Sequence, residues 1–239
     1  MVAPPSGPSD QGQQSNSPLT AGGPSALLNG SVIGHAGTVF EVRIHGRGGQ
    51  GVVTAADLLA LAAFEEGRFA QSFPSFGSER TGAPVVAYCR LDERMIRTRE
   101  PVVEPDAVIV IDPTLVHQVD LFSGLKDGGF VLINTAKTFE QLGLGSLLSR
   151  THHLRAMTAP ASDIAQRHTG RPLPNAALLG GFAAQTAEVS LEAVGTAIRD
   201  RFTDAVAEGN VAAASEVYEH VRRHTGQHAE RAALSAPTD

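Results

Sequence analysis

The chain has 239 residues, of which 42 % are hydrophobic and 18 % charged, a composition typical of one globular domain with or without a tail. Its net charge of −6 argues against a nucleic-acid-binding surface, which is usually basic. The single cysteine, Cys89, excludes a disulfide framework, a cysteine-based zinc site and an iron–sulfur cluster held by this chain alone. No apolar stretch approaches the roughly 20 residues of a membrane span, and no signal peptide is recognisable, so we expect a cytoplasmic protein.

Composition divides the chain into a folded part and two tails. Residues 1–38 are rich in Pro, Ser, Gly and Gln and hold one charged residue, Asp10. Such a segment cannot bury enough apolar surface to offset the entropy of ordering it. We therefore expect a disordered N-terminal tail over residues 1–38, a folded domain over residues 39–225 and a flexible C-terminal tail over residues 226–239.

The expected strands and helices follow from hydrophobic runs and from turn residues. The expected strands are residues 40–45, a short strand within residues 69–76, then 84–91, 95–97, 108–111 and 130–133. The expected helices are residues 50–66, 115–125, 161–168, 176–186, 191–202 and 211–224, with a break at 208–210 before the last one.

The runs at 108–111 and 130–133 are continuously apolar, which is typical of parallel strands buried on both faces. Strands alternate with helices through the first half of the chain, whereas the second half is helical in pattern. The sequence therefore predicts an α/β fold: a Rossmann-like, doubly wound, mostly parallel sheet with a helical C-terminal portion.

The most informative motif is the segment FEVRIHGRGGQGVVT, residues 40–54. Gly46, Gly48 and Gly51 have the G-x-G-x-x-G spacing directly after an expected strand and at the start of an expected helix. The first glycine permits the tight turn, the second lets the backbone approach a pyrophosphate, and the third lets helix and strand pack closely. Arg47 adds a cationic donor inside the loop. The alternative is a tight turn that binds nothing.

An NAD site would need an acid about 20 residues beyond the loop, at the end of the next strand. The acids at that distance, Glu65 and Glu66, still belong to the expected helix, and the next strand region offers Gln71 and Ser72. The motif therefore supports a pyrophosphate site but not a nicotinamide site. A P-loop for ATP is absent from the sequence.

Polar residues elsewhere extend the candidate site. Arg80 lies in a loop rich in Gly, Ser and Pro, and Asn134 follows the strand at 130–133, where open α/β sheets bind ligands. Asn175 precedes an expected helix, so helix capping is its alternative role. Asp112 also follows a strand, but an Asp-Pro pair commonly starts a turn.

Other candidates have simpler interpretations. Glu216, His220 and His224 have the i, i+4 spacing of metal ligands, but no further ligand is evident, and we expect a solvated helix face. We expect Cys89 to be a core residue. No pair of nucleophile and base is recognisable, so we predict neither a catalytic residue nor a metal ligand on this chain.

These stretches together resemble the gamma chain of the pyruvate/2-oxoacid:ferredoxin oxidoreductases. The resemblance extends over roughly residues 40–218 and is densest in the segment HGRGGQGVVTAADLLALAAFEEGRFAQSFPSFGSERTGAP. The segments EPDAVIVIDPTL, LKDGGFVLINT and RPLPNAALLGGFA continue it in order. The GRGGQG form and the FPSFGSERTGAP loop are closer to the pyruvate branch than to the 2-oxoglutarate branch, and aryl-glyoxylate relatives stay open.

The resemblance implies that different subunits of the complex hold different cofactors. The family decarboxylates a 2-oxo acid on thiamine diphosphate with Mg, passes electrons through iron–sulfur clusters to ferredoxin, and gives the acyl group to coenzyme A. This chain has neither the cluster cysteines nor a thiamine signature, so those cofactors are expected on alpha, beta and delta-type partner subunits. The resemblance implies that this chain contributes part of the coenzyme A site.

The resemblance also implies the residues of that site. Gly48, Gly49, Gln50, Gly51 and Val52 match the phosphate loop of the family, to which our reading of the motif adds Gly46 and Arg47. The residues expected at coenzyme contacts outside the loop are Arg80, Asn134 and Asn175. Two alternatives remain open: a stand-alone NAD-dependent dehydrogenase and a purely structural subunit.

Overall fold

The computed structural model describes residues 39–75, 82–150 and 153–234. Within these residues a six-stranded sheet has the order β2-β3-β1-β4-β5-β6. Strands β1, β4, β5 and β6 run parallel, and β2 and β3 join them as an antiparallel pair beside β1. The strands are β1 Phe40–Arg47, β2 Phe69–Pro74, β3 Pro84–Asp92, β4 Ala107–Val110, β5 Phe130–Asn134 and β6 Arg155–Ala159. The expected mostly parallel α/β sheet is confirmed.

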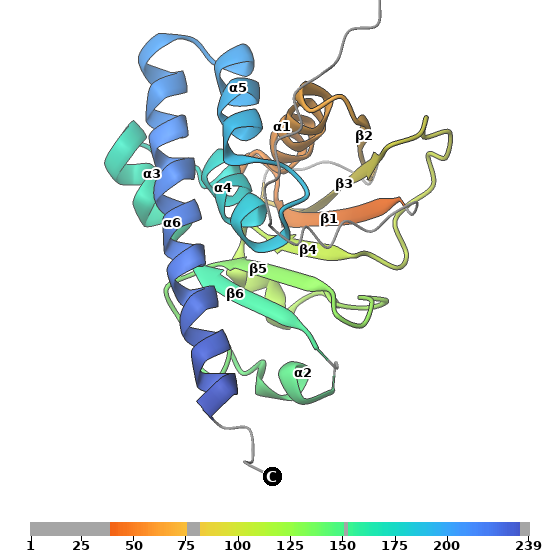
Figure 1. The fold of residues 1–239 in the computed structure, drawn as a ribbon, viewed down its shortest axis with the longest axis vertical. Coiled ribbons are helices and arrows are strands. Elements are labelled where there is room, and N and C mark those ends of the chain that lie inside the picture. The colour runs from red at the N-terminus through yellow and green to blue at the C-terminus, as the bar shows by residue number, and fades with distance from the viewer. Residues whose placement is uncertain (1–38, 76–81, 151–152, 235–239) are drawn as a thin grey trace, which may run out of the picture. The chain divides into compact units, whose positions relative to one another are not determined.

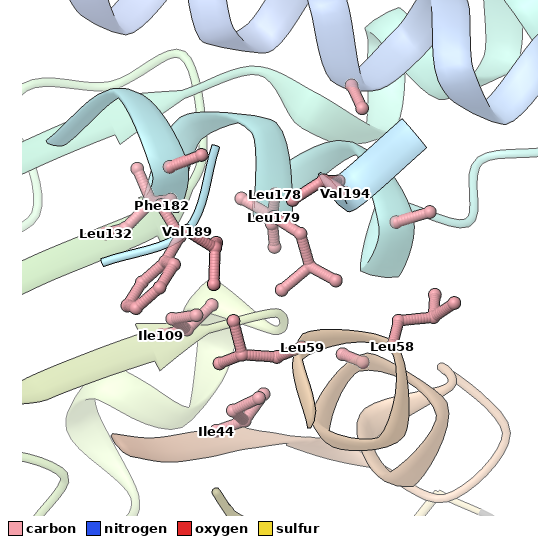
Figure 2. Close-up of a cluster of buried hydrophobic side chains, with 14 of the residues drawn as sticks. Ile44, Leu58, Leu59, Ile109, Leu132, Leu178, Leu179, Phe182, Val189 and Val194 are labelled. Carbon is pink, nitrogen blue, oxygen red and sulfur yellow. The ribbon is translucent and has the colours of Figure 1, made fainter. Parts of the chain in front are cut away.

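Helices cover one face of the sheet (Figure 1). They are α1 Val52–Glu65, α3 Ala161–Thr169, α4 Asn175–Thr186, α5 Leu191–Arg201 and α6 Asp204–Leu234. The core between them and the sheet is aliphatic. Figure 2 shows Ile44 and Ile109 of the sheet beside Leu59 of α1, with Leu179 of α4 on the far side. No described helix combines the length and the apolar character needed to cross a bilayer.

The opposite face is covered mainly by irregular chain, which differs from the helix expected over residues 115–125. Only a 3-10 turn forms, η1 Pro113–His117, and a short helix, α2 Gly145–Arg150, follows further on. Buried Arg43 explains the difference, because its Nη2 donates to the carbonyl oxygens of Leu121 at 3.0 Å and Ser123 at 2.6 Å. A helix over residues 115–125 would use the carbonyl oxygen of Leu121 for a hydrogen bond of its own.

The expected break at residues 208–210 is also wrong, since α6 runs without interruption from Asp204 to Leu234. Gly209 is required by packing instead of by a turn. A Cβ atom built there would lie 2.8 Å from the carbonyl oxygen of His168, at the end of α3. Asn210 donates to the carbonyl oxygen of Val206 at 2.8 Å, so its amide is accommodated inside the helix. The helix extends beyond residue 225, where we expected the folded domain to end.

One expected strand does not form, and one observed strand was not predicted. The expected hairpin strand at 95–97 is absent from the described chain, where β3 pairs with β1 and β2 and Met95 is 65 % exposed. Strand β6 was not predicted, because only Met157 and Ala159 of its five residues are buried. Its hydrophobic signal is therefore weak. The expected tail at residues 1–38 lies outside the described residues.

Candidate functional site

The glycine loop lies where the direction of the sheet reverses. From β1 the chain passes through α1 to β2 and β3 on one side of β1, then returns to β4 on the other side. The segments that follow β1, β4, β5 and β6 lie at one edge, because these strands run parallel. Ligands of open α/β sheets bind in the crevice at such a point.

The loop has the shape that its glycines predict. Gly46 is still part of β1, and a Cβ atom there would lie 2.6 Å from Val52 Cγ2. Gly49 and Gly51 adopt φ angles of +92° and +76°, which favour glycine. Gly48 donates its backbone N–H to the carbonyl oxygen of Ala83 at 3.0 Å, which ties the loop to the start of β3.

Helix α1 begins at the loop, and no acidic side chain in its first turn compensates the positive end of its dipole. Gly51 is its N-cap and has no side chain to accept a hydrogen bond, and its first turn contains no acid. The backbone N–H groups of Val52, Val53 and Thr54 make no hydrogen bond to the described part of the chain. Free N–H groups and the positive end of a helix dipole favour an anion at this position.

Asp112, directly after β4, holds the loop in place. Its Oδ2 accepts hydrogen bonds from Arg47 Nε at 3.1 Å and Gln50 Nε2 at 2.8 Å. Its Oδ1 accepts from the backbone N–H of Thr114 at 2.9 Å and from the Thr114 hydroxyl at 2.6 Å. Burial works to raise the pKa of Asp112, but the hydrogen bonds from Thr114 and Gln50, with the charge of Arg47, outweigh it and lower that pKa.

Arg47 is engaged by the protein itself. Besides its bond to Asp112, its guanidinium donates to the carbonyl oxygen of Gly82 at 3.1 Å and to side-chain oxygens of Thr114 and Gln118, both at 2.9 Å. Only one of its five N–H donors is left. The side chain therefore braces the loop, and the geometry gives little support to the expectation that it contacts a phosphate.

Gln50 has a similar bracing role. Its Oε1 accepts from the backbone N–H of Arg47 at 2.7 Å while its amide nitrogen donates to Asp112. Both ends of the side chain are therefore used inside the loop. What the loop presents to a ligand is backbone N–H groups, as the glycine spacing predicts.

Asn134 joins three elements at the same edge. Its Nδ2 donates to the carbonyl oxygen of Ile111 at 2.9 Å and to Ser162 Oγ at 2.8 Å, and its Oδ1 accepts from the Ser162 backbone N–H at 3.0 Å. The side chain thus links the end of β5 to the end of β4 and the start of α3.

Asn175 does not cap a helix, contrary to its alternative role, because α4 begins at Asn175 itself and Pro174 is the N-cap. Its amide lies against the glycine loop: a Cβ atom at Gly51 would be 2.4 Å from Asn175 Nδ2. The N-termini of α1 and α4 therefore meet at this contact. The first turn of α4, like that of α1, contains no acid.

A pocket of about 330 Å³ opens beside the loop. It collects residues that follow each of the parallel strands and includes two of the expected site residues, Gln50 and Asn134. Its other polar lining residues are Asp112, Thr135, Ser162 and Asp163. No Lys, Arg or His is among the described residues that line it.

Sequence reasoning missed part of this site. Ser162 and Asp163 were not recognised because β6, which delivers them to the sheet edge, was not predicted. Asp112 was noted, but only its position after a buried strand pointed to a role. Arg80, another expected site residue, lies outside the described residues.

The remaining candidates have the structural roles expected of them. Cys89 is fully buried in β3, and burial raises the pKa of its thiol, so it is a core residue. Glu216 accepts hydrogen bonds from Arg167 and His168, and these three side chains are 31 to 57 % exposed. The charges on this part of α6 therefore pair with α3 at the surface.

Comparison with known proteins agrees with this architecture. Residues 41–220 match the family described as pyruvate ferredoxin/flavodoxin oxidoreductase. The pyruvate/ketoisovalerate oxidoreductases common subunit gamma of Thermococcus kodakarensis is 47 % identical over 180 residues, which cover 75 % of this chain and 96 % of that protein.

Solved structures agree as well. The crystal structure of pyruvate oxidoreductase subunit PORC from Thermotoga maritima has a TM-score of 0.65 at 37 % identity, covering 76 % of this chain and 96 % of that one. A 2-oxoglutarate:ferredoxin oxidoreductase from Magnetococcus marinus, whose structure holds coenzyme A, has a TM-score of 0.59 at 16 % identity, over 78 % of this chain and 31 % of that one. The second likeness concerns the fold alone.

The fold and the site define an α/β subunit with a glycine loop at the switch point of its sheet, and the relatives are subunits of oxidoreductase complexes. The chain belongs to the pyruvate ferredoxin/flavodoxin oxidoreductase family, as a gamma-type subunit.

Proposed function

We propose that this chain binds coenzyme A and positions its thiol for acyl transfer within a multi-subunit 2-oxoacid:ferredoxin oxidoreductase. The observation that carries the proposal is the start of α1, where a glycine loop leaves backbone N–H groups free and the first turn contains no acid. Coenzyme A contains a pyrophosphate that suits this position. Holding the thiol near an acyl intermediate raises the rate by proximity.

In this proposal the loop from Gly48 to Val52 contacts the pyrophosphate through the backbone N–H groups of Gly49, Gly51 and Val52, since those of Gly48 and Gln50 are bonded to carbonyl oxygens of the protein. The amide of Asn175 lies close enough to Gly51 to donate to the same group. Arg80 is proposed as a further phosphate contact. The other expected residues act indirectly, because the hydrogen bonds of Arg47, Gln50 and Asn134 fix the loop and the neighbouring strand ends.

The proposed partner subunits are those that hold the other cofactors of the family. We propose that alpha, beta and delta-type subunits hold thiamine diphosphate, Mg and the iron–sulfur clusters, since the single cysteine of this chain is buried in β3. Ferredoxin or a similar acceptor then receives electrons from the complex. Pyruvate is the proposed 2-oxo acid, and a cytoplasmic location stays a prediction.

Gly51→Ala tests the proposal. The added Cβ atom would approach Asn175 Nδ2 to 2.4 Å at a φ of +76°, so the loop must shift. We expect the KM for coenzyme A of the purified complex to rise about tenfold or more, equivalent to roughly 1.4 kcal/mol or more, while the KM for pyruvate changes little.

Gly67→Ala is the matched control. Gly67 has the same φ of +76°, at the other end of α1, and a Cβ atom there would contact nothing within 4 Å. It carries the same backbone strain without touching the site. An unchanged KM for coenzyme A in folded Gly51→Ala would contradict the proposal and favour a purely structural subunit.

A further inference from the structure

One carboxylate in the pocket is not used by the fold. Asp163 lines the pocket from the first turn of α3 and makes no hydrogen bond or ion pair with the described part of the chain. Asp112, the other acid in the lining, already accepts four hydrogen bonds. Asp163 is exposed at the rim of the fold, and its carboxylate is available to accept hydrogen bonds from a group that enters the pocket.

Apart from Asp112, which is bonded to Arg47, Gln50 and Thr114, the described residues that line the pocket with Asp163 are uncharged. Ser162 Oγ accepts from Asn134 Nδ2, which leaves the hydroxyl proton of Ser162 free to be donated. Three proline residues, Pro160, Pro172 and Pro174, form part of the apolar wall. A pocket with a free carboxylate, hydroxyl groups and no cation among its described lining residues disfavours a phosphate, because a second negative charge there would be repelled.

The surroundings of the neighbouring helix starts differ. Helices α1 and α4 meet at Gly51 and Asn175 and have no acid in their first turns, whereas α3 carries Asp163. The first turns of α1 and α4 thus suit phosphates, whereas the start of α3, with Asp163, suits hydrogen-bond donors. An acid in a first turn also stabilises its helix through the dipole, and the experiment must separate that effect.

Building on the proposed coenzyme A function, we propose that this pocket binds an uncharged, hydrogen-bond-donating group of the coenzyme, with Asp163 as its acceptor. The phosphates then lie outside the pocket, at the start of α1 and α4. Two parts of coenzyme A carry such donors, namely the amino group of adenine and the amides of pantetheine. Asp163 thereby selects for the orientation of the coenzyme in the site.

The test measures affinities of the purified complex for coenzyme A, for adenosine 3′,5′-bisphosphate and for pantetheine. Asp163→Ala is expected to weaken coenzyme A binding about tenfold or more, as for loss of a hydrogen bond to a charged group. Asp163→Asn keeps the shape and one acceptor oxygen, so a smaller loss is expected. The fragment that loses affinity in Asp163→Ala identifies the group in the pocket: the bisphosphate indicates adenine, and pantetheine indicates its amides.

Glu192→Ala is the matched control, because Glu192 is the first-turn acid of α5 and does not line the pocket. It removes a helix-dipole interaction without touching the site, and coenzyme A affinity is expected to stay unchanged. An unchanged or increased coenzyme A affinity in both Asp163 variants would overturn the inference, since an increase would place a phosphate beside this carboxylate. If Gly51→Ala still weakens binding in that case, the proposed function stands without the inference.

Discussion

Asp112 orders a glycine loop whose Gln50 lies 62 residues away in the sequence. Its four hydrogen bonds fix Arg47, Gln50 and Thr114, so the loop, η1 and the end of β4 become one unit. Because the side chains of Arg47 and Gln50 are consumed in this way, the loop can offer a ligand its backbone alone. A loop that binds through its backbone depends on its conformation more than on its side chains.

At the residue scale, buried His45 is expected to make the free energy of unfolding depend on pH. It is buried in β1, its Nε2 has no hydrogen-bond partner among the described residues, and burial with the nearby charge of Arg43 lowers its pKa from 6.5 to about 4. The folded protein therefore holds His45 neutral, whereas the unfolded chain takes up a proton below pH 6.5. The resulting stability is present above pH 6.5 and is lost as the pH falls towards 4, by about 3 kcal/mol in total.

Urea unfolding of wild type and His45→Phe between pH 7 and pH 4 measures this effect. The variant is expected to lose less of its free energy of unfolding over that range, because the buried group no longer titrates. Exposed His117→Gln is the control and should follow the wild-type pH dependence. Parallel pH curves for His45→Phe and wild type would contradict the prediction.

At the scale of elements, the contact between α4 and α6 depends on a glycine. A Cβ atom at Gly180 would lie 1.9 Å from the carbonyl oxygen of Ala214, so Gly180→Ala would force the two helices apart. Overpacking of this kind is expected to lower the free energy of unfolding by about 1–3 kcal/mol. Chemical denaturation of the full chain measures the change.

Gly195→Ala in α5 is the matched comparison. A Cβ atom there would contact Arg199 at 3.4 Å and Val211 at 3.8 Å, both through side chains. Alanine is the better helix former, so this variant is expected to keep or raise stability, by up to about 1 kcal/mol. Equal losses of stability in both variants would contradict the prediction, because the close approach of α4 and α6 would then not distinguish the two positions.

The elements predicted correctly from sequence are those whose signal is local. Strands β4 and β5 are continuous apolar runs, and the turn from β1 to α1 is determined by its own glycines. The errors arise where distant residues decide. Arg43 takes the carbonyl oxygen of Leu121 that the expected helix would use, and Gly209 is required because α3 lies close to it, not because the helix breaks there.

The site could be predicted to a similar extent. The loop was found because its spacing is contiguous in the sequence, but the pocket beside it combines ends of strands from β1 to β6. The contact of Asn175 with Gly51 joins positions that no local pattern connects. Asp163 could have been noticed only after β6 was known, since that strand brings α3 to the edge.

At the scale of the whole molecule, this convergence links ligand binding to global stability. The starts of α1, α3 and α4 and the ends of four strands all meet at the site, so unfolding must destroy it. A ligand that binds only the folded state then stabilises the whole chain. At a concentration 100 times its Kd, coenzyme A is expected to raise the free energy of unfolding by about 2.7 kcal/mol.

Thermal and urea unfolding of the full chain, with and without coenzyme A, measure this stabilisation. Gly51→Ala should abolish most of it while Gly67→Ala keeps it, because only the first of these glycines faces Asn175. NAD at the same concentration is the control ligand and should give no stabilisation, since the acids about 20 residues beyond the loop, Glu65 and Glu66, lie at the end of α1 and not at the end of the next strand. Stabilisation by NAD without stabilisation by coenzyme A would contradict the proposed function and would assign the loop to a nicotinamide cofactor. The reason is that the ligand that raises the unfolding free energy is the one that the folded site recognises.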